Sequence, residues 1–510
     1  MTADAVMGID LGTSVVKAGI YTFDGRLQAT ASVPLRLIHG PDGRIEQDLD
    51  EMYGAAAAAS RACLASFPAS RVAAVAMDGQ MAGIGIVDSA HRPAAPYDSW
   101  LDTRCGDMVA ELGAKLGERI TQTAGCAPTI SIGPKMLWWR RHRPDVCENA
   151  ASFVTASGYV AGRAVGLAGK DAFIDPSYLH FTSVADVGRG VWDEDLAADA
   201  GIDARLLPRI VESTQVVGTL TPAAAADFGL PTGVPMAAGC GDTAATALGG
   251  GVAEAGQSFD SAGTAGVFGV CIPSFVPDTA ARTLMTMRSA LPGRWYALGY
   301  VSGAGQLVEW ACRELLGRAE FDDEAYAALA AAVARVPVGS NGVLVFPHFT
   351  GQVAPAAAAA RGAFLGLTPT TTRDHMARAT LESIALEYRR YAEIIRATAG
   401  SNAITEVIGT GGGSRLAVWN QMKADVLGVP YRPVAAVDTG TRGAAIVAMA
   451  SLGVAAPDLG DEEWAAPEMP DPAATTAYKQ VYELYRRWAD VLVDGYNGQA
   501  ANSARRREQD

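Results

Sequence analysis

Short apolar runs alternate with longer stretches of helical spacing along most of the chain. Val15–Tyr21 and Leu27–Val33 have the period of two that β-strands show, and Asp24-Gly25 between them is typical of a hairpin turn. Asp48–Phe67 follows as an alanine-rich helix that begins at an aspartate cap. Because strands and helices keep alternating, the pattern predicts an α/β fold whose sheets are largely covered by helices.

The same pattern places the remaining elements and divides the chain. Further strands are predicted at Arg71–Met77, Ile84–Val87, Val234–Ala238, Gln257–Ser261, Gly266–Cys271, Trp295–Val301, Val343–Phe346, Ile404–Ile408 and from Tyr431. Further helices are predicted at Thr103–Lys115, Pro134–His142, Gly158–Gly166, Trp192–Ala200, Ala244–Leu248, Gly305–Leu316, Asp323–Val336, Arg373–Thr398, Arg415–Leu427, Arg442–Leu452 and Ala474–Asn497. The Gly249-Gly250-Gly251 run separates an N-terminal domain, residues 1–251, from a C-terminal domain, residues 252–454.

The end of the chain differs in character from the two domains. Residues 455–497 form a linker rich in proline and acidic residues, followed by the closing helix. We expect an apolar stripe of that helix to pack on the body; its residues are Tyr478, Val481, Leu484, Trp488 and Leu492. Residues 498–510 are polar and charged, and we expect them to be disordered.

Composition narrows the class of protein. The chain has 510 residues, of which 19% are charged, so it holds enough apolar material for two large cores. The net charge of −14 argues against nucleic acid or an anionic membrane as a partner. The seven cysteines form no Cys-x-x-Cys pair, the N-terminus lacks the pattern of a signal peptide, and no run of 18 apolar residues occurs. These features predict a cytoplasmic protein with reduced thiols.

Three glycine-rich loops carry the candidate chemistry. Val6–Ser14 is an apolar strand that ends in a carboxylate, a glycine and two hydroxyls, and Phe259–Gly266 repeats that arrangement half a chain later. Gly409–Ser414 closes a strand and opens a helix. Such loops present backbone N–H groups that can hold phosphate oxygens. One loop alone is more often an ordinary hairpin, but two near-copies indicate a duplicated fold with a nucleotide between the halves. A dinucleotide-binding Gly-x-Gly-x-x-Gly unit and a Walker A sequence are both missing.

Taken together, these motifs resemble those of the FGGY carbohydrate kinases, in the actin/hexokinase/Hsp70 ATPase superfamily. The resemblance runs from Ala5 to Asn497. The segments that carry it are Gly8–Ser14, Ser261–Thr264 and Gly411–Ser414 for the phosphate and adenosine loops, Pro134–Trp138 for the N-terminal signature, Gly362–Leu367, His375-Met376 and Ala379–Glu382 for the C-terminal signature, and Gly239–Asp242 for the catalytic aspartate. It implies two actin-like (ribonuclease H-like) α/β domains with an interdomain cleft.

The family resemblance also implies ATP and Mg²⁺ as cofactors. It makes Asp242 the general base toward the attacking hydroxyl, and Asp10 the carboxylate that holds Mg²⁺ through water. The nucleotide-binding residues that it implies are Gly12, Thr13, Ser14, Lys17, Ser261, Gly263, Thr264, Gly411, Gly412, Gly413 and Ser414. Two of these assignments have alternatives, because Asp242 can cap the helix Ala244–Leu248 and Lys17 can be an exposed strand residue.

The sugar side departs from the family pattern. Gln80-Met81 matches the Gln-Met-His of xylulose kinases, with Ala82 in place of the histidine. The substrate-binding residues that the resemblance implies are Gln80, Met81, Trp100, Asp102 and Asp242. For Trp100 a core position is the alternative, and for Asp102 a helix cap. Gly351–Pro355 lacks both charges of the Gly-Glu-Arg-Thr-Pro that xylulose kinases tend to have, and Asp175 is interpreted either as a turn residue or as a substrate contact.

The expected activity is transfer of the γ-phosphate of ATP to a hydroxyl of a small ketose, with a pentulose such as xylulose as first choice. Another polyol (erythritol, a pentitol or glycerol) or another ketose is the second choice. An actin-like ATPase acting on protein is the alternative from a different class. The expected partner is a small-molecule sugar or polyol, with neither nucleic acid nor membrane, and a homodimer is the candidate assembly.

Overall fold

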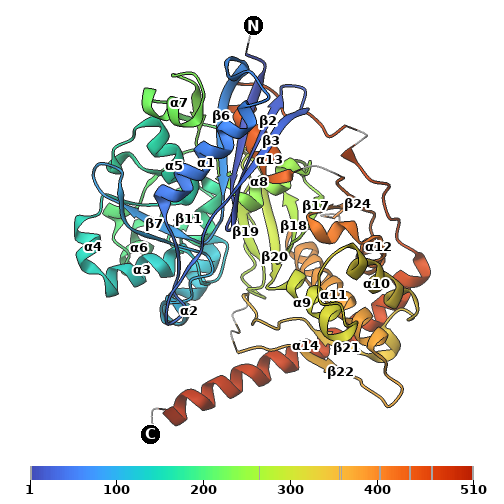
Figure 1. Ribbon diagram of the computed structural model, residues 1–510. Helices are drawn as coiled ribbons and strands as arrows, with labels where there is room; N and C mark the ends of the chain where they lie inside the picture. The colour runs from blue at the N-terminus through green and yellow to red at the C-terminus, as the bar shows by residue number, and fades with distance from the viewer. Residues whose placement is uncertain are drawn as a thin grey trace.

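The computed structural model describes residues 3–263, 265–354, 357, 359–400, 404–435, 438–460 and 463–507. Two α/β halves lie beside one another, the first half of the chain in blue to green and the second in yellow to red (Figure 1). Each half contains one large sheet with helices packed on it. The predicted α/β class and the division into two large units are therefore present.

The N-terminal half is built on a seven-stranded sheet in the order β14-β15-β6-β1-β2-β3, with β16 also beside β6. Its strands are β1 (Ala5–Leu11), β2 (Val15–Thr22), β3 (Leu27–Pro34), β6 (Val72–Gly79), β14 (Val216–Thr219), β15 (Pro235–Ala237) and β16 (Cys240–Gly241). β1 runs parallel to β6 with Asp10 opposite Asp78, and β16 runs parallel to β6 with Cys240 opposite Asp78. The carboxyl ends of β1, β6 and β16 consequently meet at one edge of the sheet.

A second, five-stranded sheet lies in the same half, in the order β4-β5-β8-β7-β9. Its strands are β4 (Ile38–His39), β5 (Ile45–Gln47), β7 (Ile84–Val87), β8 (Pro93–Asp98) and β9 (Ser152–Val154). Two two-stranded ribbons complete the half: β10 (Phe173–Ile174) with β13 (Arg209–Ile210), and β11 (Ala185–Asp186) with β12 (Val191–Trp192). The five-stranded sheet holds the segments around Gln47, Gln80 and Trp100, because β5, β7 and β8 flank them in sequence.

The C-terminal half has a six-stranded sheet in the order β19-β20-β18-β17-β23-β24. Its strands are β17 (Gln257–Ala262), β18 (Gly266–Ile272), β19 (Met285–Arg288), β20 (Trp295–Val301), β23 (Glu406–Thr410) and β24 (Tyr431–Pro433), and a separate pair is β21 (Leu344–Phe346) with β22 (Ala363–Leu365). β17 runs parallel to β23 with Ser261 opposite Thr410. The second and third glycine-rich loops therefore leave the sheet side by side.

Most of the predicted helices are present. The second helix, however, continues to Ala124 where its predicted end was Lys115, and the helices Pro144–Asn149 and Pro222–Phe228 were not predicted. The first half has α1 (Leu49–Leu64), α2 (Gly106–Ala124), α3 (Ile132–His142), α4 (Pro144–Asn149), α5 (Ala156–Val165), α6 (Glu194–Ala200), α7 (Pro222–Phe228) and α8 (Asp242–Gly249). The second half has α9 (Ala304–Trp310), a π-helical turn at Ala311–Leu315, α10 (Asp323–Ala334), α11 (Arg373–Ala399), α12 (Ala417–Leu427), α13 (Thr439–Ser451) and α14 (Pro472–Arg507). The aspartate cap predicted for the first helix is present, because Asp48 accepts hydrogen bonds from backbone N–H groups at the start of α1. Asp193 caps α6 in the same way.

Helix α13 joins the two halves. Although it lies in the second half of the sequence, it packs on α8, β1 and β6 of the first half. Glycine allows this close approach, because a Cβ at Gly443 would lie 2.0 Å from the Ala245 carbonyl oxygen and one at Gly249 would lie 1.9 Å from the Thr439 carbonyl oxygen. The predicted boundary at Gly249–Gly251 thus falls at the end of α8, but α13 returns across it.

The closing helix differs from its prediction in two ways. It is continuous from Pro472 to Arg507, where disorder was expected after residue 497, and its last turns project from the body (Figure 1). The face that packs on the body carries Tyr478, Tyr482, Tyr485 and Ala489, while Leu484 and Trp488 of the predicted stripe are each 45% exposed. Hydrogen bonds from Tyr478 to Glu382 and from Tyr485 to Glu387 fix this rotation of the helix, since each satisfies a buried carboxylate of α11.

The predicted linker is also attached to the body. Isolated bridges pair Val434 with Trp464 and Tyr431 with Glu468. The segment therefore extends the edge of the C-terminal sheet before α14 begins.

Candidate active site

Four carboxylates and one lysine converge where β1, β6 and α8 end or begin. Asp10 is the penultimate residue of β1, Asp78 lies opposite it on β6, Asp242 is the first residue of α8, and Asp438 caps α13. Lys17 Nζ lies 2.9 Å from the carboxylate of Asp438 and 3.9 Å from that of Asp10. Lys17 is therefore not simply an exposed strand residue, because its ammonium group pairs with carboxylates of this cluster.

Asp242 stands on a fixed backbone, and its carboxylate accepts a hydrogen bond from the Thr243 hydroxyl over 3.2 Å. The N-cap of α8 is Gly241 rather than Asp242, so the alternative role of Asp242 as a helix cap does not apply. The backbone N–H of Gly241 donates to Ser177 Oγ over 2.8 Å, and Ser177 Oγ donates to the carboxylate of Asp175 over 2.6 Å. This relay holds the turn that carries Asp242, and it gives Asp175 the turn role that was one of its two interpretations.

The surroundings of Asp242 raise its pKa to about 7, first because the carboxylate is buried and second because Asp10 is close. Burial, opposed by Lys17 and assisted by Asp438, raises the pKa of Asp10 to about 6. A carboxylate whose pKa lies near neutrality can accept a proton from a hydroxyl and release it again at neutral pH.

The first glycine-rich loop is tied to both sheets of the N-terminal half. Trp100 Nε1 donates to Thr13 Oγ1 over 2.9 Å, and Gln47 Nε2 donates to the Thr13 carbonyl oxygen over 2.8 Å. Gly12 and Thr13 are half-buried and Ser14 is exposed. The loop thus presents its hydroxyls and N–H groups from a rigid base.

The second and third glycine-rich loops touch. A Cβ at Gly411 would lie 2.9 Å from the carbonyl oxygen of Ala262, and Gly411 has a φ of 79° that favours glycine. Ser261 is half-buried and Gly263 is exposed beside it, whereas Thr264 lies outside the described residues. Gly412 is exposed as well, while Gly413 and Ser414 are buried at the start of the turn before α12. The two loops together form one glycine-rich surface at the edge of the C-terminal sheet.

The predicted sugar-binding residues fall into two groups. Gln80 donates from Nε2 to Gln47 Oε1 over 2.8 Å, while its Oε1 has no donor among the described residues, and Met81 packs beside Gly241. Asp102, in contrast, is 1% exposed and accepts from the Ile45 N–H and from the guanidinium of Arg104. Its carboxylate is fully engaged in the framework, so the geometry does not favour a contact between Asp102 and substrate.

Two buried groups near Asp242 were not singled out from the sequence. The hydroxyl of Tyr97 and both carboxylate oxygens of Asp78 have no hydrogen-bond partner in the described part of the chain. Asp78 directly precedes Gly79-Gln80, but a single carboxylate at the end of a strand is no signal by itself. Lys135, within the N-terminal signature, donates to the carbonyl oxygens of Ala82 and Ser99 and so joins the loops that carry Met81 and Trp100.

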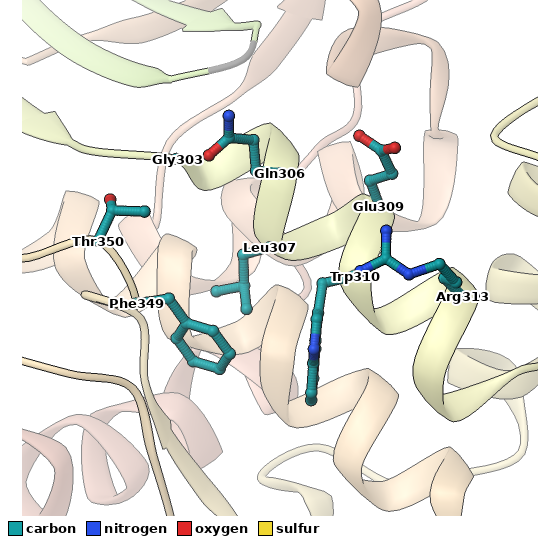
Figure 2. Close-up of a pocket in the computed structure, with 8 residues that line it drawn as sticks. All are labelled: Gly303, Gln306, Leu307, Glu309, Trp310, Arg313, Phe349 and Thr350. Atoms are coloured by element: carbon teal, nitrogen blue, oxygen red, sulfur yellow. The ribbon is translucent and has the colours of Figure 1, made fainter. Parts of the chain in front are cut away.

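A cavity of about 310 Å³ lies against α9 in the C-terminal half, and the sequence did not indicate it (Figure 2). Its lining includes Gln306, Glu309, Trp310, Arg313, Phe349 and Thr350. The rings of Trp310 and Phe349 meet edge to face, with centroids 5.2 Å apart. In Figure 2 the polar ends of Gln306 and Glu309 lie on one side of this aromatic pair.

Comparison with known proteins identifies the class of enzyme to which this fold and site belong. The model of the N-terminal domain of the FGGY family of carbohydrate kinases matches residues 5–249, and that of the C-terminal domain matches residues 260–452. The chain is thus a carbohydrate kinase, a phosphotransferase with an alcohol group as acceptor, and it belongs to the FGGY family. This result sets aside the actin-like ATPase acting on protein.

Similar proteins agree with this assignment. The xylulose kinase of Escherichia coli is 28% identical over 497 residues, covering 96% of this chain and 99% of that protein. A glycerol kinase of Solidesulfovibrio magneticus is 31% identical over 464 residues, covering 88% of this chain and 90% of that protein. The crystal structure of xylulose kinase from Rhodospirillum rubrum superposes with a TM-score of 0.86 at 27% identity, over 97% of this chain and all (100%) of that one. The predicted pair of actin-like domains is confirmed.

Membrane spans and clusters of metal ligands were sought in the part of the chain that the structure describes. Within it, no helix is both long and apolar enough to cross a membrane. Likewise, no three His, Cys, Asp or Glu side chains in the described ranges are grouped in a way that would by itself hold a metal ion.

Proposed function

We propose that this enzyme transfers the γ-phosphoryl group of ATP to a hydroxyl of a small ketose, and that the ketose is a pentulose such as xylulose. The observation that supports this most directly is the placement of Asp242. Asp242 is half-buried at the first turn of α8, free of the capping role, and lies close to Asp10, where the first glycine-rich loop begins. A general base beside a phosphate-binding loop is the arrangement that phosphoryl transfer to an alcohol requires.

Asp242 then accepts the proton of the attacking hydroxyl as that oxygen bonds to the γ-phosphorus, while the bond from the γ-phosphorus to the bridging oxygen breaks and ADP leaves. The loops around Thr13, Ser261 and Gly411 orient the nucleotide, with their N–H groups directed at phosphate oxygens. We assign the nucleotide contacts to Gly12, Thr13, Ser14, Lys17, Ser261, Gly263, Thr264, Gly411, Gly412, Gly413 and Ser414, as the family resemblance implies. Closure of the two halves excludes water that would otherwise compete for the phosphoryl group.

The residues at the cluster fit a Mg²⁺ ion. Mg²⁺ keeps several waters and takes one or two carboxylates together with phosphate oxygens, so three protein ligands are not needed. Asp10 is 15% exposed at its side chain and lies beside the loop that would hold the phosphates. A bound Mg²⁺ ion would neutralise charge on the phosphates, and Asp10 would keep the ion in position.

The sugar would lie between Gln80, Met81 and Trp100, within reach of Asp242. Gln80 Oε1 and the Tyr97 hydroxyl are polar atoms without partners in the described part of the chain, and hydroxyls of a sugar can supply them. Asp102 is not among the proposed sugar contacts, because its carboxylate is bonded within the protein framework. Relatives named xylulose kinase favour a pentulose, while the similar glycerol kinase makes glycerol a second candidate. A homodimer and a cytoplasmic location remain part of the proposal.

An ADP-release screen over ketoses and polyols of three to seven carbons, with Mg²⁺ and ATP, tests the proposal. We expect the highest kcat/KM with a pentulose, and a loss of at least a hundredfold in kcat for Asp242→Asn with ADP affinity retained. ADP release that is equal with and without every sugar, or near-normal turnover in Asp242→Asn, would contradict the proposed function.

A further inference from the structure

Asp78 is a buried carboxylate without the partners that such groups normally have. It lies opposite Asp10 in the parallel register of β1 and β6, so both side chains lie on the same face of the sheet. Its exposed fraction is 0%, and among the described residues no N–H, hydroxyl or ammonium group donates to either oxygen; the one polar group within hydrogen-bond reach is the carboxyl of Asp10. An ionised carboxylate in this state is costly unless a cation is near.

Other buried carboxylates in the same protein show what a structural role looks like. Asp175 accepts from the Ser177 N–H, Ser177 Oγ and Ser213 Oγ. Asp260 accepts from Tyr388, Tyr431 and Lys423. Each is as enclosed as Asp78, and each has three donors. The fold therefore supplies donors where a carboxylate serves only the framework, and among the described residues it supplies none to Asp78.

Most of the ionisable groups that face Asp78 are acidic, so they carry the same sign of charge as Asp78 when ionised. They come from every element packed around it: Asp10 on β1, Asp242 on α8 and Asp438 at α13, with Cys240 on β16 opposite. Lys17 on β2 is the one cation among them in the described residues, and it is already paired with Asp438 at 2.9 Å. A divalent cation beside Asp10 would balance this excess of negative charge.

We propose that Asp78 is the second carboxylate of the Mg²⁺ seat, and that Asp10 and Asp78 together hold the cation that accompanies the nucleotide. This inference rests on the proposed function, because it takes its cation from the metal-nucleotide substrate. Two carboxylates on adjacent strand ends match the small number of protein ligands that Mg²⁺ uses alongside phosphate oxygens. With Asp78 included, the protein contributes two carboxylates to the metal site instead of one.

The test is the affinity of the protein for ADP, measured by calorimetry with Mn²⁺ and again in EDTA, without any sugar. In the wild type, the metal should strengthen ADP binding. In Asp78→Asn we expect at least a tenfold loss of that enhancement, with affinity in EDTA unchanged. Asp10→Asn should behave alike. Asp278→Asn is the matched control, because Asp278 is buried and accepts three backbone N–H bonds far along the sequence; its metal enhancement should equal that of the wild type.

Melting of the metal-free protein separates this role from a structural one. Since Asn removes a charge repelled by Asp10 and Asp242, Asp78→Asn should melt at the same temperature as the wild type or higher, whereas Asp278→Asn should melt lower. Metal enhancement that survives in Asp78→Asn would overturn the inference. If the Asn variant does not fold, Asp78→Ser is subject to the same comparison. Because no sugar is present, failure of this test leaves the phosphorylation screen unaffected, and the reverse also holds.

Discussion

Asp242 is enclosed by protein beside a second carboxylate, and both features favour its protonated form at neutral pH. Since only the ionised carboxylate can accept a proton, activity should fall on the acidic side of its pKa, which is about 7. We predict that kcat/KM for the sugar declines about tenfold per pH unit below that value. Initial rates at saturating ATP over the neutral and mildly acidic range check this. A profile that is flat through pH 7 and falls only below pH 5 would argue against Asp242 as the titrating base.

Ser177 links a buried carboxylate to the turn that carries Asp242. Removing its hydroxyl in Ser177→Ala leaves the Gly241 N–H without its acceptor, and a buried unsatisfied donor costs about 1–3 kcal/mol. We predict that kcat falls about tenfold or more while the KM for ATP changes little, because the displaced group is the base rather than a nucleotide contact.

Ser213→Ala is the control for that variant. Ser213 also donates to Asp175, over 3.0 Å, but does not touch Gly241. Its kcat should stay within about twofold of the wild type even though a hydrogen bond of about 1 kcal/mol is lost. Equal losses of kcat in both variants would show that Asp175, and not the position of Gly241, accounts for the effect.

The residues that the sequence could indicate were those with a motif around them. Asp10, Asp242 and the glycine-rich loops stand at strand ends within recognisable segments, and the structure brings Asp10 and Asp242 to one edge. Asp102 stood in such a segment too, yet its carboxylate faces Arg104 and Ile45. The direction of a side chain in a loop depends on what the distant β5 strand donates, which no local pattern contains. Asp78 had no motif, and only its missing partners reveal it.

At the level of elements, two helices meet through glycine. A Cβ at Gly443 of α13 would lie 2.0 Å from the Ala245 carbonyl oxygen on α8, a contact that backbone cannot relieve without moving a helix. We predict that Gly443→Ala lowers the free energy of unfolding by about 2 kcal/mol or more, despite the better helix propensity of alanine. Urea unfolding measures the difference.

Gly113→Ala on α2 is the matched control, because a Cβ added at Gly113 would meet no described atom within 4 Å. At Gly113 only the higher helix propensity of alanine contributes, so the substitution should stabilise the protein by about 0.5–1 kcal/mol. If both variants change stability in the same direction, the contact between α8 and α13 is not as tight as the geometry indicates.

The elements themselves were largely predictable because strand and helix periods are local. The rotation of α14 was not. Its sequence offers more than one apolar face, and the buried one is selected by Glu382 and Glu387 on α11, which need the hydroxyls of Tyr478 and Tyr485. The packing of α13 on the first half was not predictable either, because it depends on the topology of the fold. The sequence boundary at Gly249–Gly251 marks only where one strand-helix unit stops.

For the whole molecule, the site has a consequence for stability. The pKa values of Asp98, Asp175 and Asp242 are raised to about 7 and that of Asp10 to about 6, in each case first by burial. In the unfolded chain these groups ionise near pH 4. Between pH 4 and 7 the folded state therefore binds more protons, so folding becomes less favourable as pH rises through this window. Burial of His180, whose pKa is lowered to about 3, acts in the opposite direction, but only below about pH 6.5 where the unfolded histidine gains its proton.

We therefore predict that the protein in EDTA is more stable at pH 6 than at pH 8. Each raised carboxyl contributes at most about 1.4 kcal/mol per pH unit, so several together should raise the melting temperature by several degrees. Thermal unfolding at the two pH values measures the difference. Asp242→Asn removes one of the four carboxyls, so its difference between pH 6 and pH 8 should be smaller than that of the wild type. Greater stability at pH 8 in the wild type would mean that these carboxylates find partners in the folded protein that offset their burial.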